Sequence, residues 1–194
     1  MRRADPDRDA AACARIYAPF VTDSVASFEH AAPDAAEMGR RIAETGRTHP
    51  WLVLERDGRV VGFAYGTQHR ARAAYRWAAD VSVYVDGEHH RSGAGRVLYT
   101  DLLDRLRAQG VYTVCAGITL PNPASVALHE AVGFRRIATY PSVGFKLGSW
   151  RDVGWWQARL CEPPADPAPP LALDFAMGQP GWEDALRAGL PSLR

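Results

Sequence analysis

The stretch HHRSGAGRVLYTDLL, residues 89–103, places two glycines between a basic cluster and a run of apolar residues at helical spacing. Glycine lets backbone N–H groups approach a ligand closely, and a helix that follows directs the positive end of its dipole at the turn. A turn of this kind is suited to a phosphate or pyrophosphate group. Many similar turns simply begin a helix, so the sequence on both sides must decide what this one holds.

The elements on either side of the turn are well marked. Residues 78–86, AADVSVYVD, have the pattern of a strand whose alternate valines share one face. The helix predicted over residues 93–109 carries leucines four residues apart on one stripe, and Gly110 is suited to end it. Asp101 and Arg105 have the spacing of an ion pair on this helix. The sequence therefore predicts a strand, a glycine turn and a long helix in direct succession.

The rest of the chain predicts a mixed α/β (α+β) fold. An Asp-Gly turn joins two apolar runs in residues 51–66, which is typical of a β-hairpin. Strands and helices do not alternate regularly, which argues against a doubly wound dinucleotide fold. We expect a central, mostly antiparallel, twisted sheet flanked by about four helices. The other predicted elements are helices over 5–20 and 33–46, a strand over 111–118, a short helix from Asn122 to Gly133, and strands over 134–140 and 151–160.

The composition changes at Cys161. The segment CEPPADPAPP, residues 161–170, is rich in proline and cannot join a packed sheet. We therefore expect one domain over residues 1–160. Residues 161–194 are expected to form a proline-rich C-terminal tail, a candidate for partial disorder, with a short helix at residues 181–189.

Composition narrows the class of protein. The chain has 194 residues, of which 47% are hydrophobic and 23% charged, and its formal net charge is +1. This balance gives no reason to expect a nucleic-acid or membrane partner. Cys13, Cys115 and Cys161 are odd in number and widely spaced, so they fit neither a disulfide framework nor a zinc site. We expect a cytoplasmic protein without a metal.

Two phosphate-binding motifs do not fit the glycine turn. A P-loop needs a lysine after its last glycine, and a dinucleotide fingerprint needs a third glycine and a later acidic residue. The turn instead resembles the coenzyme A turn of the GNAT acetyltransferases, and more narrowly that of their phosphinothricin N-acetyltransferase group. The resemblance covers about residues 1–160. It is carried by HPWLV at 49–53, ARAAYRW at 71–77, VSVYV at 81–85, HRSGAG at 90–95, LPNPASVALHEAVGF at 120–134 and GFKLGSWRDVGWWQ at 144–157.

The sequence departs from the group at three positions. His90 stands where Gln or Arg is usual, Asp80 replaces the glutamate of the strand, and Ala18 replaces an asparagine near the end of the first helix. These departures bear on the preferred acceptor rather than on the fold or the cofactor.

The resemblance implies acetyl-CoA as cosubstrate. N–H groups of the turn are expected to face its pyrophosphate, with arginines adding charge at the helix entrance. The backbone of the preceding strand is expected to pair with the pantetheine arm. The expected cofactor residues are Val83, Tyr84, Val85, His90, Arg91, Ser92, Gly93, Ala94, Gly95, Arg96, Asn122 and Ser125.

Two side chains are candidates for proton transfer. Asp80 matches the family's glutamate and is the candidate base, acting directly or through water because its side chain is one methylene shorter. The alternative is a solvated acid at a strand end. His129 matches the histidine of the phosphinothricin group. It could take the amine's proton as an imidazole or protonate the thiolate as an imidazolium, or it could be purely structural.

The expected acceptor site is less sharply marked. Arg70 and Arg72 lie on the same side of an extended segment and suit a carboxylate or phosphinate, although they could equally form a solvated basic loop. Phe28 and Tyr75 are candidate walls of the pocket. Family members form dimers, so we expect a homodimer in which Lys146 approaches the site across the interface.

The sequence thus predicts an acetyl-CoA-dependent N-acetyltransferase. Its expected acceptor is the α-amine of a small amino acid such as phosphinothricin or methionine sulfoximine, attacking directly in a ternary complex. One alternative is a GNAT enzyme for another amine, such as a protein N-terminus or a polyamine. Another is a non-catalytic GNAT-fold sensor that binds coenzyme A.

Overall fold

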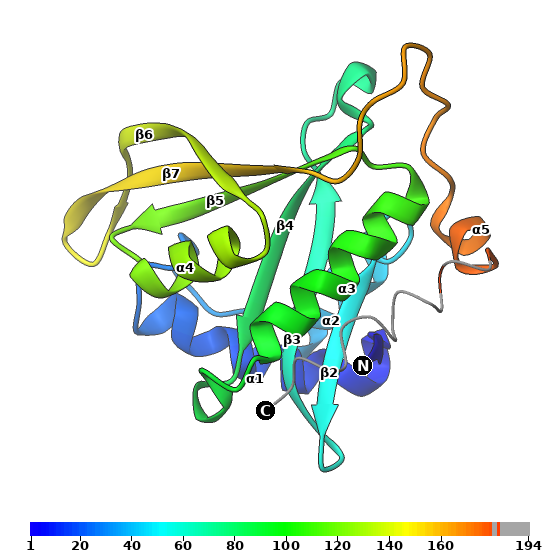
Figure 1. Cartoon of the computed structure of the whole chain (residues 1–194). Helices are drawn as coiled ribbons and strands as arrows, with labels where there is room; N and C mark the ends of the chain where they lie inside the picture. Colours follow the sequence, from blue (N-terminus) through cyan, green and yellow to red (C-terminus); the bar gives the residue numbers. More distant parts are fainter. Residues whose placement is uncertain (180–181, 183–194) are drawn as a thin grey trace.

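A computed structural model describes residues 1–179 and 182. It confirms the predicted mixed α/β fold, with one seven-stranded sheet and helices on both of its faces (Figure 1). The helices are α1 (Pro6–Thr22), α2 (Ala35–Thr45), α3 (Ala94–Gln109), α4 (Pro123–Ala131) and α5 (Leu173–Met177). The strands are β1 (Arg2–Arg3), β2 (Trp51–Arg56), β3 (Arg59–Gln68), β4 (Ala78–Val85), β5 (Thr113–Leu120), β6 (Arg135–Lys146) and β7 (Ser149–Arg159).

The strand order is β1-β2-β3-β4-β5-β7-β6, and β4 and β5 form its one parallel pair. This parallel ladder is short: it joins Ala78–Asp80 to Thr113–Cys115 and then stops. Beyond it, β4 remains paired with β3 and β5 with β7. The two central strands therefore separate in the middle of the sheet, directly after Asp80.

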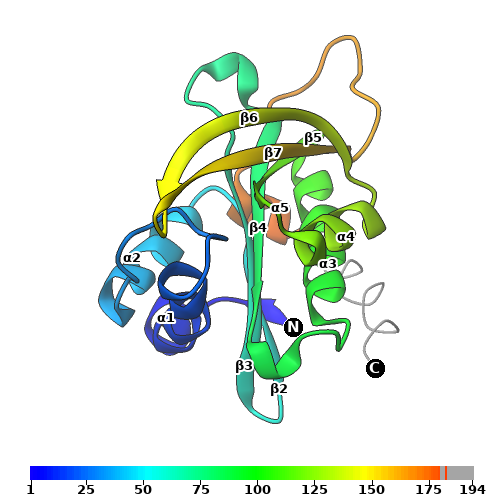
Figure 2. The same cartoon turned by 90° about the vertical axis from the view of Figure 1, so that its left-hand side faces the viewer.

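Helices cover the two faces of the sheet in pairs. Figure 2 shows α1 and α2 on one side and α3 and α4 on the other, with β6 and β7 arching over the top. The leucine stripe of α3 is fully buried against the sheet, as its spacing predicted. The face under α1 and α2 carries a second core that includes Ile16, Val53 and Phe63.

The helix ends confirm the local sequence signals. Asp5 caps α1 by accepting hydrogen bonds from two first-turn N–H groups, and Asn122 caps α4 by accepting one from Ser125. Gly110 ends α3 with a φ of 95°, a backbone conformation that favours glycine. These caps set the start of α4 and the length of α3, the two helices beside the separated strands.

The described part of the C-terminal segment packs against the domain. Leu171 exchanges hydrogen bonds with Gln109 at the end of α3, and the Trp77 indole donates to the carbonyl of Ala168. Leu173 of α5 is buried. Residues 161–179 thus lie along the body of the protein. The helix predicted at residues 181–189 lies outside the described residues apart from Trp182, which is buried.

In the part of the chain that the structure describes, no helix has the length and apolar character needed to cross a membrane.

Candidate functional site

A cavity of about 910 Å³ opens where β4 and β5 separate. Its walls are the exposed edge of β4, the glycine turn with the start of α3, the second half of β5, and α4. It brings together every predicted cofactor residue except Ser92. The Ser92 hydroxyl instead donates to the carbonyl of His89, 2.7 Å away, and so holds the turn. Sequence patterns did not identify Gly117–Thr119 of β5, which form the opposite wall.

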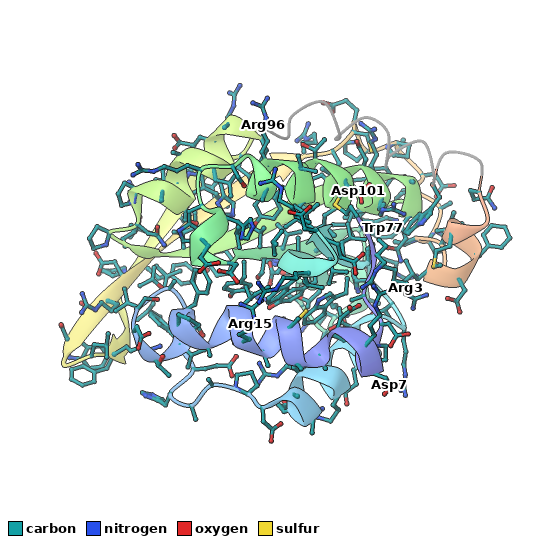
Figure 3. All side chains as sticks on the ribbon, turned by 90° about the horizontal axis from the view of Figure 1, so that it is seen from below. Arg3, Asp7, Arg15, Trp77, Arg96 and Asp101 are labelled. Carbon is teal, nitrogen blue, oxygen red and sulfur yellow. The ribbon has the colours of Figure 1, made fainter. Side chains whose placement is uncertain are left out.

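The glycine turn has the shape of an anion site. Arg91 and Gly93 both have positive φ, 61° and 85°, and Gly93 caps α3 without a side chain that could accept its first N–H groups. Among the described residues, the N–H groups of Gly95 and Arg96 have no hydrogen-bond acceptor. Arg91 and Arg96 are exposed beside them, and Figure 3 shows Arg96 extending outward from α3. Free donors, a helix dipole and two guanidinium groups suit a diphosphate.

Gly95 also sets how closely α3 and α4 approach each other. A Cβ at this position would lie 3.0 Å from a methyl group of Leu128 on α4. The second glycine of the turn therefore keeps α4 close to the start of α3, where both helices line the cavity.

The edge of β4 offers backbone groups to an extended ligand. Within the described chain, residues 81–85 have no strand partner on the β5 side, because the parallel ladder ends at Asp80. Val83, Tyr84 and Val85 line the cavity along this edge. An extended chain of amide groups can pair with such an edge as an added strand does. Together with the anion site at its end, the cavity fits the pyrophosphate and the amide-containing arm of coenzyme A.

Asp80 lies at the point where the strands separate, on the face of β4 opposite Val81 and its core neighbours. Its carboxylate accepts a hydrogen bond from Nδ1 of His69 at 2.7 Å. Burial raises the pKa of Asp80, and the hydrogen bond from His69 and the charge of Arg70 oppose that rise. Sequence patterns missed His69, because nothing local marks a histidine that lies just beyond the end of β3.

The Cys115 thiol lies beside this pair. The polar side-chain atoms of His69, Asp80 and Cys115 are all within 4.8 Å of one another. Cys115 itself is buried in β5, and burial raises the pKa of its thiol. The thiol form is therefore favoured over the nucleophilic thiolate.

His129 is buried on α4, and both of its ring nitrogens are engaged. Its Nδ1 donates to the backbone carbonyl of Ser125 at 2.7 Å, so Nε2 accepts from the Tyr99 hydroxyl at 2.8 Å. Burial lowers the pKa of His129, which favours a neutral ring. Of the three roles left open for His129, this arrangement is at odds with the imidazolium donor and leaves the imidazole base and the structural role. Tyr99, which sequence patterns did not identify, also lines the cavity.

Of the candidate acceptor residues, the structure places Arg70 and Tyr75 near the His69–Asp80 pair. Arg70 and Arg72 are exposed on the segment that follows β3. The charge of Arg70 is close enough to Asp80 to act on the pKa of its carboxyl group, in the direction opposite to burial. The Tyr75 ring lies edge-on to His69, with centroids 5.8 Å apart. Phe28 lies on the loop between α1 and α2 and packs against Gly144 of β6.

Lys146 is placed differently from our expectation. Its side chain is 4% exposed, and its Nζ donates to the backbone carbonyls of Val21, Ser27 and Glu29 in the same chain. Burial lowers the pKa of this ammonium group, and the charge of Glu29 opposes the shift. All three N–H donors are thus used to hold the loop that carries Phe28. Within one chain, Lys146 shapes the acceptor side of the site and has no free donor for a substrate.

Comparisons with known proteins agree with this geometry. Residues 3–155 match the acetyltransferase (GNAT) domain family. The chain is 41% identical to a phosphinothricin N-acetyltransferase of Streptomyces viridochromogenes over 161 residues, which are 83% of this chain and 87% of the relative. It is 39% identical to an L-methionine sulfoximine/L-methionine sulfone acetyltransferase of Salmonella typhimurium over 114 residues, covering 59% of this chain and 67% of that protein.

A solved structure shows the same fold. The phosphinothricin acetyltransferase of Sinorhizobium meliloti, determined in complex with acetyl-CoA, superposes with a TM-score of 0.80 at 32% identity, covering 89% of this chain and 96% of that one. A family match over most of the chain, a shared fold and a cavity suited to coenzyme A lead to one conclusion: this chain is a member of the GNAT acetyltransferase family.

Proposed function

We propose that the protein is an acetyl-CoA-dependent N-acetyltransferase for the α-amino group of a small amino acid such as phosphinothricin or methionine sulfoximine. The observation that carries this proposal is the position of Asp80. Its carboxylate lies where β4 and β5 separate, beside the cavity suited to coenzyme A. The positive charge of Arg70 is close enough to lower the pKa of this carboxylate, against the effect of burial. The names of the Streptomyces and Salmonella relatives support the choice of acceptor.

The cosubstrate supplies an acetyl group as a thioester. In the proposal, the N–H groups of Gly95 and Arg96 and the guanidinium of Arg91 bind the diphosphate, and the free edge of β4 orients the pantetheine arm. Asn122 and Ser125, which line the same cavity at the start of α4, bind the arm from the opposite side.

The acceptor amine is protonated at neutral pH, so a base must remove a proton before it attacks. Asp80 provides the negative charge for this step. Arg70 and Arg72 bind the acidic groups of the amino acid, and Phe28 and Tyr75 contact its side chain. Attack is direct, because Cys115, the cysteine beside Asp80, is buried and favours its thiol form.

Three alternatives predict different behaviour. A polyamine acceptor would need acidic groups where Arg70 and Arg72 stand. A protein N-terminus would bind as an extended peptide rather than through its own carboxylate. A sensor would bind acetyl-CoA without turnover. In that case the Asp80 carboxylate would have no role in proton transfer.

Product analysis separates these possibilities. The purified protein is incubated with acetyl-CoA and one acceptor at a time: phosphinothricin, methionine sulfoximine, spermidine, or a short peptide with a free N-terminus. Mass spectrometry should find one acetyl group on the α-nitrogen of the first two acceptors. Acetylation of spermidine or the peptide alone would contradict the proposed acceptor class.

Gly93→Val tests the anion site. Valine is strained at a φ of 85° and distorts the turn, so we expect the dissociation constant for acetyl-CoA to rise about tenfold or more, equivalent to about 1.4 kcal/mol. Isothermal titration calorimetry measures the change. Gly58→Val is the matched control, because Gly58 has a φ of 74° in the β2–β3 turn, outside the cavity. Equal affinities in the two variants would contradict the assignment of the turn.

We further propose that the protein is a cytoplasmic homodimer that works without a metal. The β6–β7 hairpin supports the dimer, because β6 is an edge strand and its apolar residues lack cover in the described chain. Five large apolar side chains of the hairpin are more than half exposed: Ile137, Val143, Phe145, Leu147 and Trp150.

Trp150→Glu tests the dimer. A carboxylate in the apolar patch should shift the protein to monomers, measured by size-exclusion chromatography with light scattering. Phe175→Glu is the control, because Phe175 is similarly exposed but lies on α5, away from the hairpin. A wild-type monomer, or a dimer that survives Trp150→Glu, would contradict this interface.

A further inference from the structure

We propose that His69 is the group that accepts the proton of the acceptor amine and that Asp80 positions it, so that the two side chains act as a carboxylate–imidazole pair. This inference deepens the proposed function and rests on it. Its basis is the 2.7 Å hydrogen bond between Nδ1 of His69 and Oδ1 of Asp80 at the point where β4 and β5 separate.

The hydrogen bond fixes which nitrogen of His69 is basic. An ionised carboxylate can only accept a hydrogen bond, so Nδ1 of His69 carries the hydrogen. The lone pair then lies on Nε2, on the far side of the ring. An imidazole held in this way by an acid is an efficient proton acceptor near neutral pH.

The surroundings hold the ring in place and leave it accessible. The side chain of His69 is 16% exposed and that of Asp80 is 30% exposed. Tyr75 and Trp155 both lie edge-on to the ring, with centroids 5.8 and 6.5 Å away. Two aromatic side chains and one carboxylate therefore restrict the ring, while both members of the pair still reach solvent.

Among the described residues, the charged and titratable neighbours of His69 come from three segments. Arg70, which donates to the backbone carbonyl of His69, and Tyr75 belong to the segment after β3, Asp80 belongs to β4, and Cys115 belongs to β5. Burial raises the pKa of Asp80, while the hydrogen bond from His69 and the charge of Arg70 act in the opposite direction. The groups on these two sides thus favour the anionic form that the positioning role requires.

This pair accounts for the short acid at position 80. An aspartate reaches one methylene less far than the glutamate that the GNAT resemblance leads one to expect there. With His69 bound to the carboxylate, the basic atom becomes Nε2, which lies beyond the reach of the Asp80 oxygens. The imidazole thus takes the place of the water through which the shorter acid could otherwise act.

The proton balance is simple. One proton passes from the acceptor's ammonium group to Nε2 of His69, and the neutral nitrogen forms its bond to the acetyl carbon as the bond from that carbon to sulfur breaks. The nitrogen loses its second proton as the amide forms, and the leaving sulfur gains one. The net release is one proton, which His69 passes to solvent.

The decisive variant is His69→Asn. Its side-chain amide can still donate to Asp80 from about the position of Nδ1, but it has no basic nitrogen. We expect kcat to fall by about 10²- to 10⁴-fold with little change in the KM values or in the acetyl-CoA dissociation constant. His30→Gln, an exposed histidine, is the control and should leave the rate unchanged.

A second variant separates a base from a purely structural residue. Added imidazole should restore part of the rate of His69→Gly, because it can occupy the vacated space, and should leave Asp80→Asn unrescued. A rate for His69→Asn within about threefold of the wild type would overturn the proposal and make Asp80 the direct base. So would loss of wild-type activity after treatment with a chelator, since His69, Asp80 and Cys115 are close enough to surround a divalent cation.

The wild-type rate is measured first with the full acceptor panel. Turnover by the wild type together with an active His69→Asn variant overturns only the role of His69. No turnover with any acceptor overturns the proposed function itself, and the role of His69 with it.

Discussion

Asp80→Asn is expected to lower kcat by about 10²- to 10⁴-fold, the usual contribution of general-base catalysis, while acetyl-CoA binding stays within about twofold of the wild-type value. Asparagine has nearly the same shape as aspartate, so it should fit between β3 and β5 without disturbing the sheet. It carries no negative charge to stabilise a protonated His69, its NH2 group can donate to Nδ1 and so favour the other tautomer, and it cannot accept a proton itself. The cavity suited to coenzyme A lies beyond Asp80 along β4, which is why binding should survive.

The measurement pairs initial rates of thiol release with calorimetric titration of acetyl-CoA. Asp57→Asn provides the control, because Asp57 is exposed in the β2–β3 turn and the substitution removes the same charge. A rate for Asp80→Asn within about threefold of the wild type would show that this carboxylate takes no part in proton transfer. A protein that bound acetyl-CoA but showed no turnover even as the wild type would fit the sensor alternative instead.

Asp101→Ala is expected to lower the free energy of unfolding by about 3–5 kcal/mol, the usual cost of breaking a buried ion pair. Asp101 accepts a hydrogen bond from Nε of Arg105 at 3.0 Å, and their side chains are 0% and 4% exposed. The Arg105 guanidinium also lies over the ring of Trp182, 4.8 Å from its centroid. Without Asp101, a buried cation would lose its counter-charge.

Urea denaturation measures this loss, and the same helix offers a matched control. Asp104 and Arg107 also form an ion pair on α3, but their side chains are 23% and 55% exposed. Asp104→Ala should therefore cost about 1 kcal/mol or less. Replacing both Asp101 and Arg105 with leucine should recover much of the lost stability, since no unpaired charge remains. Equal losses for Asp101→Ala and Asp104→Ala would contradict the buried pair.

The Asp101–Arg105 pair was only partly predictable from the sequence. The spacing of Asp101 and Arg105 was enough to predict their contact, because neighbours on one helix face follow from helical geometry. Their burial was not predictable from that spacing. It depends on the C-terminal segment, which the proline-rich composition suggested would be a separate tail.

The His69–Asp80 pair was also only partly predictable. The sequence pattern of the strand identified Asp80 as a candidate, whereas no pattern identified His69. The two meet because β3 and β4 pair with Thr67 opposite Asp80. His69 is two residues after Thr67, so it lies diagonally across from Asp80 on the same face. That register depends on the whole hairpin, and no local pattern encodes it.

Contacts between distant segments were the least predictable. Lys146 binds backbone carbonyls more than a hundred residues earlier in the chain, and Tyr99 on α3 meets His129 on α4. Carbonyl oxygens have no sequence signature, so the role of Lys146 in holding the 21–29 loop could not be deduced in advance. The separation of β4 and β5 likewise depends on the pairing of the whole sheet, so no local sequence pattern predicts it.

The central claim is that this chain transfers an acetyl group to the α-amine of a small amino acid such as phosphinothricin. Its most direct test is the initial rate of thiol release from acetyl-CoA with phosphinothricin as acceptor, compared with the same compound blocked at its α-nitrogen. We predict saturable release with the free amine and none above background with the blocked compound. Equal release in the two reactions, or none in either while acetyl-CoA still binds, would contradict it.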